Sequence, residues 1–148
     1  MKCPMCHASE LVDTKTRDSI KIGGRTFVVE DLPAEECPAC GEVLIGAVPL
    51  MEFDREVARY LAEHGPINGE TFSFIHSAFG ITYDDLAPML GVAQSTLSRW
   101  ANGKRPVDRN AWFVLASLVL EPERTRRRMA VAQKPTGAKR LTIKLKAA

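Results

Sequence analysis

The chain has 148 residues, of which 45% are hydrophobic and 26% are charged, a balance that is typical of soluble globular proteins and excludes a disordered or collagen-like chain. The longest uncharged apolar stretch, residues 111–120, is half of the roughly 20 residues that a membrane helix needs, and the N-terminus has no apolar signal core. We therefore expect a cytoplasmic protein. Residues 1–67 carry a net charge of −5 and residues 68–148 one of +7, which indicates two parts with different tasks.

The four cysteines form two pairs with the same spacing, and they are the strongest local signal. Cys3 and Cys6 make the first C-x-x-C pair, and Cys37 and Cys40 make the second. Two such turns can place four thiolates around one Zn²⁺ with Zn–S distances of ~2.3 Å. All four metal positions are then filled by protein and none is left for water. The spacing predicts one structural zinc ion per chain.

Three other interpretations of the cysteines fit less well. A redox dithiol normally begins a helix, whereas both pairs lie in turns that contain proline. His7 completes a C-x-x-C-H haem-attachment pattern, but that chemistry requires export. Four cysteines without a metal would leave the identical spacing unexplained. In the zinc interpretation His7 has no ligand role.

Short β-segments are predicted between the two cysteine pairs, at residues 10–14, 19–22 and 25–32. Gly23 and Gly24 separate the last two segments and signal a hairpin turn. A helix with apolar residues at helical spacing then starts near Pro49 and ends before Gly65. We expect residues 1–67 to form a small zinc-clipped β-domain with a connecting helix.

The pattern changes to short helices in the next part of the chain. Thr82, with Asp85 three residues later, predicts a capping box at the start of one helix, and Asp108 caps another that is apolar nearly all round and suits a dimer contact. Pro88 predicts a kink or an early end in the helix that Thr82 starts. The expected helices lie at residues 70–79, 93–101 and 109–120, with one more between Thr82 and Gly91. With the β-domain, this all-α domain of four to five helices at residues 68–120 gives an α+β fold.

Two of these helices, joined through Gly91, form a helix-turn-helix, whose later helix can enter the major groove of DNA. Arg99 on that helix could bind both O6 and N7 of a guanine. The alternative is a polar face that only meets solvent. The expected contacts to base edges are Gln94, Ser95, Thr96, Ser98 and Arg99, and the expected phosphate contacts just beyond them are Asn102, Lys104 and Arg105.

The same region resembles the Xre/Cro-type helix-turn-helix, through the stretches ITYDDLA, LGV, STLSRW and NGK between Ile81 and Lys104. The N-terminus adds MKCPMCH, and CPACGE follows it later in the chain. Together these motifs resemble the MqsA (YgiT-type) antitoxins over residues 1 to about 120.

The resemblance implies a type II antitoxin: a homodimer whose zinc-bound N-terminal domain binds a ribonuclease toxin, and whose C-terminal domain binds a palindromic DNA operator and represses its own operon. It assigns the four cysteines as zinc ligands and Arg99 as a base-reading residue. Ser95 stands where the family has a base-reading asparagine. Tyr83 stands where Xre-type domains commonly have glutamine, which puts its phosphate contact in doubt.

The alternatives to an antitoxin are a regulator without a toxin and an enzyme. A stand-alone zinc-ribbon helix-turn-helix regulator without a toxin would have the same sequence features. An enzyme is not expected, because the chain has no paired-carboxylate pattern, nucleophile motif or phosphate loop, and a closed zinc site leaves no position for a substrate.

The C-terminal extension, residues 121–148, departs most from the family pattern. It carries nine basic and two acidic side chains, and apolar residues alternate with Thr and Lys over residues 141–146. Three interpretations are open: a solvated, partly disordered extension, a basic arm along DNA phosphates, and a final segment that pairs as a β-strand with another chain.

Overall fold

The computed structural model describes residues 1–146. An antiparallel sheet of three strands in the order β1-β2-β3 is followed by six helices within these residues, which confirms the α+β class. None of these helices is both long and apolar enough to cross a membrane. The strands are β1 (Val12–Ile22), β2 (Arg25–Glu36) and β3 (Val43–Leu44), and the helices are α1 (Ala47–His64), α2 (Gly69–Ala78), α3 (Tyr83–Leu90), α4 (Gln94–Ala101), α5 (Arg109–Leu120) and α6 (Pro122–Gln133).

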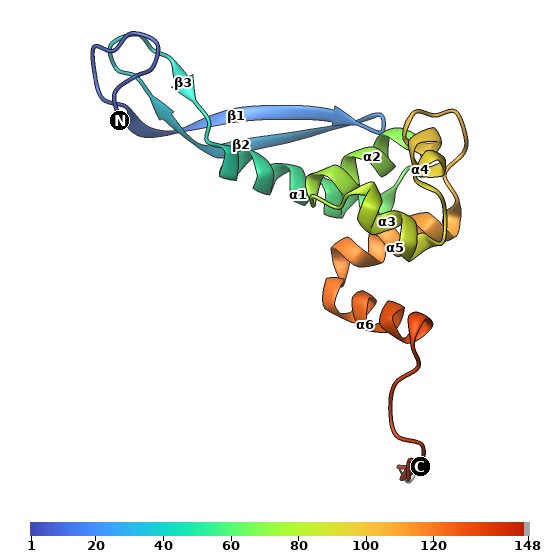
Figure 1. Cartoon of the computed structure of the whole chain (residues 1–148). Coiled ribbons are helices and arrows are strands. Elements are labelled where there is room, and N and C mark those ends of the chain that lie inside the picture. The colour runs from blue at the N-terminus through green and yellow to red at the C-terminus, as the bar shows by residue number, and fades with distance from the viewer. Residues whose placement is uncertain (147–148) are drawn as a thin grey trace.

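The β1–β2 hairpin is longer than the sequence predicts, and it projects from the helical body (Figure 1). Residues 10–14 and 19–22 were expected as separate segments, but one strand runs through them from Val12 to Ile22. The polar residues between them do not end the strand, because alternate residues along β1 face solvent anyway. The strand partners shift near Arg17, so that Glu30 and Asp31 of β2 lie opposite this one residue in a β-bulge.

The hairpin turn is anchored to the helical body. Gly23 and Gly24 have positive φ angles of 61° and 74°, as a tight glycine turn requires. The Gly23 N–H donates a 3.1 Å hydrogen bond to a carboxylate oxygen of Glu70 at the start of α2. A Cβ at Gly23 would lie 2.8 Å from Thr71 Cγ2 and 2.9 Å from Pro66 Cδ, so only glycine fits here without movement.

The hydrophobic core lies among the helices and receives the foot of the hairpin. Leu61 of α1, Phe72 of α2 and Leu115 of α5 are fully buried in it. From the hairpin, Ile20 and Phe27 pack against the same cluster. The sheet and the helices therefore share one continuous core, whereas the cysteine end of the hairpin lies far from it (Figure 1).

Pro88 lies inside α3, and the helix runs from its cap at Thr82 to Gly91. The capping box is confirmed, because the Asp85 N–H donates to Thr82 Oγ1 at 3.2 Å and the Thr82 N–H donates back to the Asp85 carboxylate at 3.3 Å. The helix α3 continues only two residues past Pro88. It ends at Gly91, which has a left-handed φ of 64°, and the Val92 N–H then donates to the carbonyl of Ala87.

The C-terminal extension begins with a helix that the sequence analysis did not predict. Pro122 occupies the first turn of α6, where its missing N–H costs nothing. Thr125 is buried and its hydroxyl donates a 2.9 Å hydrogen bond to the carbonyl of Ser117 in α5. None of the three interpretations of the extension included this helix. Residues 135–146 have neither helix nor strand in the described chain.

Candidate metal centre and nucleic-acid interface

The four cysteine sulfurs converge at the far end of the hairpin. All four Sγ atoms lie within 4.8 Å of one another. The Sγ atoms of Cys3 and Cys40 are 3.8 Å apart, and those of Cys6 and Cys37 are 3.5 Å apart. A tetrahedron with Zn–S bonds of ~2.3 Å has edges of ~3.8 Å. The four side chains are therefore spaced as a tetrahedral metal site requires, and they could hold a metal ion.

The two cysteine turns have the same backbone geometry, which the sequence analysis did not foresee. In the first, the His7 N–H donates to the Cys3 carbonyl at 3.1 Å, and in the second the Gly41 N–H donates to the Cys37 carbonyl at 2.8 Å. His7 and Gly41 both have positive φ angles, of 56° and 74°. His7 is thus the counterpart of a turn glycine, and its side chain is exposed.

The hydroxyl of Ser9 joins the two turns. The hydroxyl oxygen of Ser9 lies 3.2 Å from Cys37 Sγ in the second turn. The backbone carbonyl of Ser9 accepts a 3.0 Å hydrogen bond from the Cys3 N–H in the first turn. The Ser9 hydroxyl lowers the pKa of the Cys37 thiol to about 6, because it stabilises the thiolate. The thiolate is the form that binds a metal. No motif in the sequence marks Ser9 for this contact.

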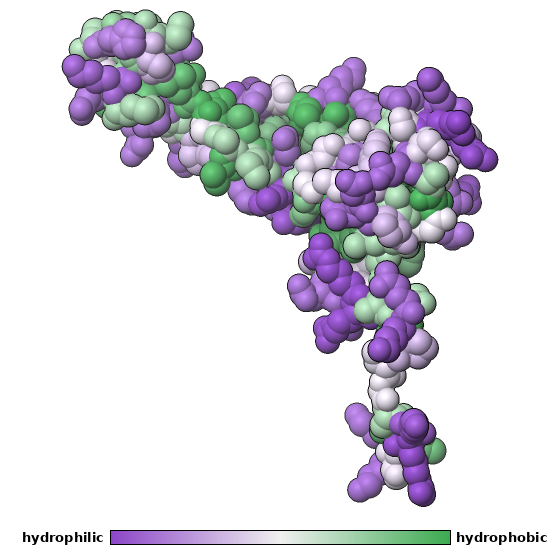
Figure 2. Space-filling view, in the orientation of Figure 1, coloured by the Kyte–Doolittle hydropathy of each residue, from purple (hydrophilic) through white to green (hydrophobic). Residues whose placement is uncertain are grey.

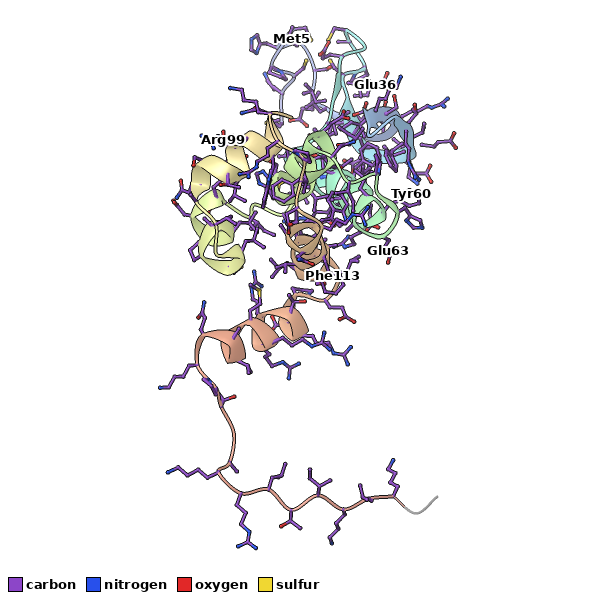
Figure 3. All side chains as sticks on the ribbon, turned by 90° about the vertical axis from the view of Figure 1, so that its right-hand side faces the viewer. Met5, Glu36, Tyr60, Glu63, Arg99 and Phe113 are labelled. Carbon is purple, nitrogen blue, oxygen red and sulfur yellow. The ribbon has the colours of Figure 1, made fainter. Side chains whose placement is uncertain are left out.

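The helix α4 presents a polar face on the outside of the body and an apolar face to the core. Leu97 and Trp100 are buried, as predicted. Figure 3 shows Arg99 on the outer side of this helix. Gln94, Ser95, Arg99, Asn102, Lys104 and Arg105 are exposed, and Thr96 and Ser98 are half-buried.

Hydrogen bonds hold parts of this polar face in place. The Gln94 amide donates to the Asp84 carboxylate on α3. The Asn102 amide donates to Ser98 Oγ at 3.3 Å. At the end of α4, the backbone N–H groups of Lys104 and Arg105 both donate to the Arg99 carbonyl, at 2.9 and 3.2 Å. The chain therefore turns directly after α4, and the backbone of Lys104 and Arg105 stays close to that of Arg99.

Tyr83 begins α3 and directly precedes Asp84, whose carboxylate accepts the hydrogen bond from Gln94 of α4. It stands at the first position of α3, is half-buried and packs against the hydrophobic core. Its ring centroid is 5.1 Å from that of His76 in α2. The structure therefore gives Tyr83 a packing role.

Gly69, which no sequence motif marks, sets the position of α4. Gly69 is the first residue of α2, and a Cβ there would lie 2.1 Å from the carbonyl oxygen of Trp100. The backbone of α2 thus touches the end of α4 directly. A lone glycine at a helix start carries no local signal of such a contact, because the partner lies some thirty residues further along the chain.

Comparison with known proteins places these features in one family. The model of the MqsA family, the antitoxin component of bacterial toxin-antitoxin systems, matches residues 1–126. This match includes both cysteine pairs and the helices α1 to α5. A search of curated proteins found no match. On the strength of a family match that spans most of its length, the chain belongs to the MqsA antitoxins.

Proposed function

We propose that this protein is a DNA-binding repressor that acts as a type II antitoxin. Membership of the MqsA family supports an antitoxin and transcription-regulator role without catalysis. The observation that carries the DNA-binding part is the exposed polar face of α4, which lies opposite the buried Leu97 and Trp100. The helices α3 and α4, joined at Gly91, act as the helix-turn-helix, and α4 enters the major groove.

Within this proposal most of the exposed residues of this face have a role that their chemistry supports. Arg99 binds the O6 and N7 atoms of a guanine. Lys104 and Arg105 bind phosphates, and their N–H bonds to the Arg99 carbonyl keep their backbone close to that of the base-reading residue. Ser95 contributes a hydroxyl at the start of the helix. Gln94 must first release its bond to Asp84 if it is to contact a base.

The metal in the proposed function is zinc, with Cys3, Cys6, Cys37 and Cys40 as its ligands. Four thiolates suit Zn²⁺, and with all positions filled the ion stabilises a fold and offers no open position for a reaction. Its role is to join the N-terminal cysteine turn to the cysteine turn that follows β2. The domain organisation that we propose has a zinc-binding part at residues 1–67, a DNA-binding part at 68–120 and a basic extension at 121–148.

A homodimer would use the apolar surface of α5 and α6. The side chain of Phe113 is 70% exposed, which is unusual for a large aromatic residue on an otherwise buried helix. It borders a groove that also contains Val114 and Met129. Burial of this groove against a second copy would pair two α4 helices for half-sites about one helical turn, ~34 Å, apart on a palindromic operator.

The toxin part of the proposal rests on family membership and on charge. The net −5 of residues 1–67 favours a basic partner, as a ribonuclease that binds RNA would be. Co-purification with the product of the neighbouring reading frame tests it. A stand-alone regulator would bind its promoter and retain no such protein.

The DNA-binding proposal is tested by the Arg99→Ala variant. We expect a loss of roughly 1–3 kcal/mol in binding to the protein's own promoter, together with relaxed preference at one base position of each half-site. Fluorescence anisotropy with a set of single-base operator variants measures both effects. Arg17→Ala is the matched control, because Arg17 is an exposed cation on β1, outside the proposed DNA-binding part. Unchanged affinity of Arg99→Ala would refute the assignment of α4.

A further inference from the structure

A groove runs between β2 and α1, and it is not used by any role proposed above. We call it the β2–α1 groove; its volume is about 700 Å³. Val48 in this groove is 69% exposed, and Figure 2 shows a hydrophobic surface between the cysteine end and the helical body. Its apolar residues are Val28, Val29, Leu32, Val48, Pro49 and Phe53.

One side of the groove is a strand edge without a partner. β1 pairs with one edge of β2 along nearly its whole length, whereas β3 pairs with the other edge only at Glu35 and Glu36. Within the described chain, residues 25–34 of β2 therefore have a second edge with no strand beside it. An apolar groove between a free strand edge and a helix is the geometry that accepts an extended peptide by β-augmentation.

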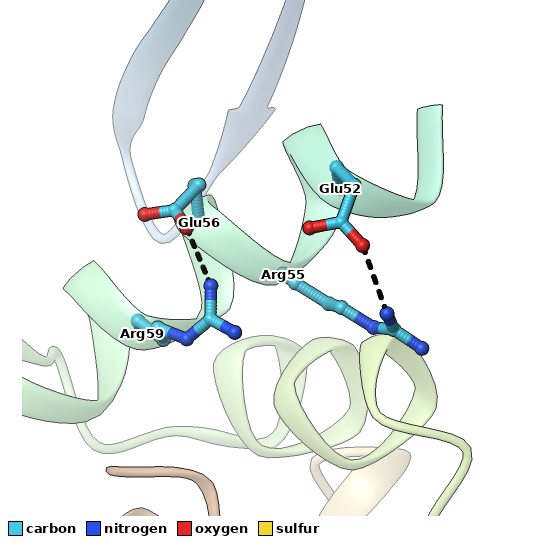
Figure 4. A network of polar contacts seen from close by, with 4 residues as sticks. All are labelled: Glu52, Arg55, Glu56 and Arg59. Carbon is cyan, nitrogen blue, oxygen red and sulfur yellow. Dashed lines mark hydrogen bonds and ion pairs between the residues drawn. The ribbon is translucent and has the colours of Figure 1, made fainter. Parts of the chain in front are cut away.

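The remaining lining residues of the groove are acidic, apart from Pro33, and none is basic. Glu30 and Asp31 lie side by side in the β-bulge, and neither forms an ion pair within the described residues. Glu52 and Glu56 reach neighbouring arginines of α1 (Figure 4), but these pairs are exposed and contribute little. The groove therefore favours an extended segment that is both apolar and cationic.

Such a segment exists in this chain, at residues 141–146. The side chains of Leu141, Ile143 and Leu145 are 75%, 72% and 89% exposed, so nothing in the described chain covers them. They alternate with Thr142, Lys144 and Lys146, and in an extended strand the three apolar side chains share one face. Lys139 and Arg140 directly precede the segment.

We propose that residues 141–146 of one copy bind as an added strand in the β2–α1 groove of a second copy. Leu141, Ile143 and Leu145 then cover the apolar residues of the groove, and the flanking lysines approach Glu30 and Asp31. The second copy is the occupant because α6 is fixed to α5 by the Thr125 hydroxyl, and the chain after it leads away from its own sheet (Figure 1). This self-association needs neither DNA nor a toxin.

Photo-crosslinking in the full-length protein tests the proposal. A benzoyl-phenylalanine replaces Ile143 and keeps the position apolar, and an equal mixture of isotopically labelled and unlabelled chains is irradiated. We expect crosslinked peptides that join the label-distinct copies, with the second peptide drawn from residues 28–33 or 48–56. The double variant Glu30→Lys, Asp31→Lys should lower the yield by about tenfold or more, because the lysines then face like charges.

The control is Glu63→Lys, a charge reversal of an exposed residue in the last turn of α1, outside the groove. In this variant the crosslinking yield should stay unchanged. Circular dichroism of both variants establishes that each is folded. Three results overturn the proposal: crosslinks within one chain, crosslinks to the groove around Phe113, or equal yields in the groove variant and in the control. The crosslinking reaction contains neither DNA nor a toxin, so its outcome does not depend on the proposed function.

Discussion

The contact between Gly69 and the end of α4 predicts a clear effect of a single methyl group. In Gly69→Ala, the new Cβ would lie 2.1 Å from the Trp100 carbonyl oxygen and 3.0 Å from that of Ala101. Since ordinary contacts of this kind are about 3.4 Å or longer, the end of α4 must move by more than ~1 Å. Overpacking of this kind costs roughly 1–3 kcal/mol.

Urea denaturation of the zinc-loaded protein measures this cost, and promoter binding measures the displacement of α4. The sign of the change in the free energy of unfolding is informative. Alanine is a better helix former than glycine by up to ~1 kcal/mol, so the substitution would stabilise α2 if no clash occurred. Gly46→Ala is the control: a Cβ there meets only Pro49 Cδ at 3.5 Å, and the φ angle of Gly46 is −68°. A Gly69→Ala protein that is as stable as the parent would refute the reasoning.

Three further predictions concern the metal end and the pH dependence. Ser9→Ala should lower zinc affinity about tenfold in competition with a coloured chelator, while Ser19→Ala on the exposed side of β1 should not. Chelation should change the amide NMR signals of the two cysteine turns but leave those of α1, because Leu61 is fully buried in the helical core; loss of the α1 signals would contradict this. Burial lowers the pKa of His76, so protonation favours the unfolded chain. Stability should therefore be highest above pH ~6.5 and decline as the pH falls below it, and His76→Phe should flatten that decline in denaturation midpoints measured at several pH values.

The features that could be predicted from the sequence are those in which a residue acts on its near neighbours. Thr82 and Asp85 form the predicted capping box three residues apart, and Asp108 caps α5 by accepting the Ala111 N–H. The hairpin turn was predictable for the same reason, because Gly23 and Gly24 are adjacent and both adopt positive φ angles. The cysteine pairs were predictable because their spacing itself encodes two turns.

The features that could not be predicted depend on partners distant in the chain. Ser9 contacts Cys37 only because the hairpin returns the chain to the same place. Gly69 touches Trp100, and its role appears only once α2 and α4 are packed. The helix α6 was missed because its basic composition resembles a solvated segment, whereas Thr125 anchors it to α5 through a carbonyl that the sequence does not mark.

The anchored hairpin turn also fixes a spacing. β1 has 11 residues, so the hairpin spans ~36 Å from the foot at Glu70 to the cysteine end. Its foot rests on the first turn of α2, and the first residue of α2 touches the last turn of α4. The hairpin therefore fixes the distance between the cysteine end and α4, and with it the distance between molecules bound at these two sites. Lengthening β1 and β2 by two residues each would increase this distance by ~7 Å.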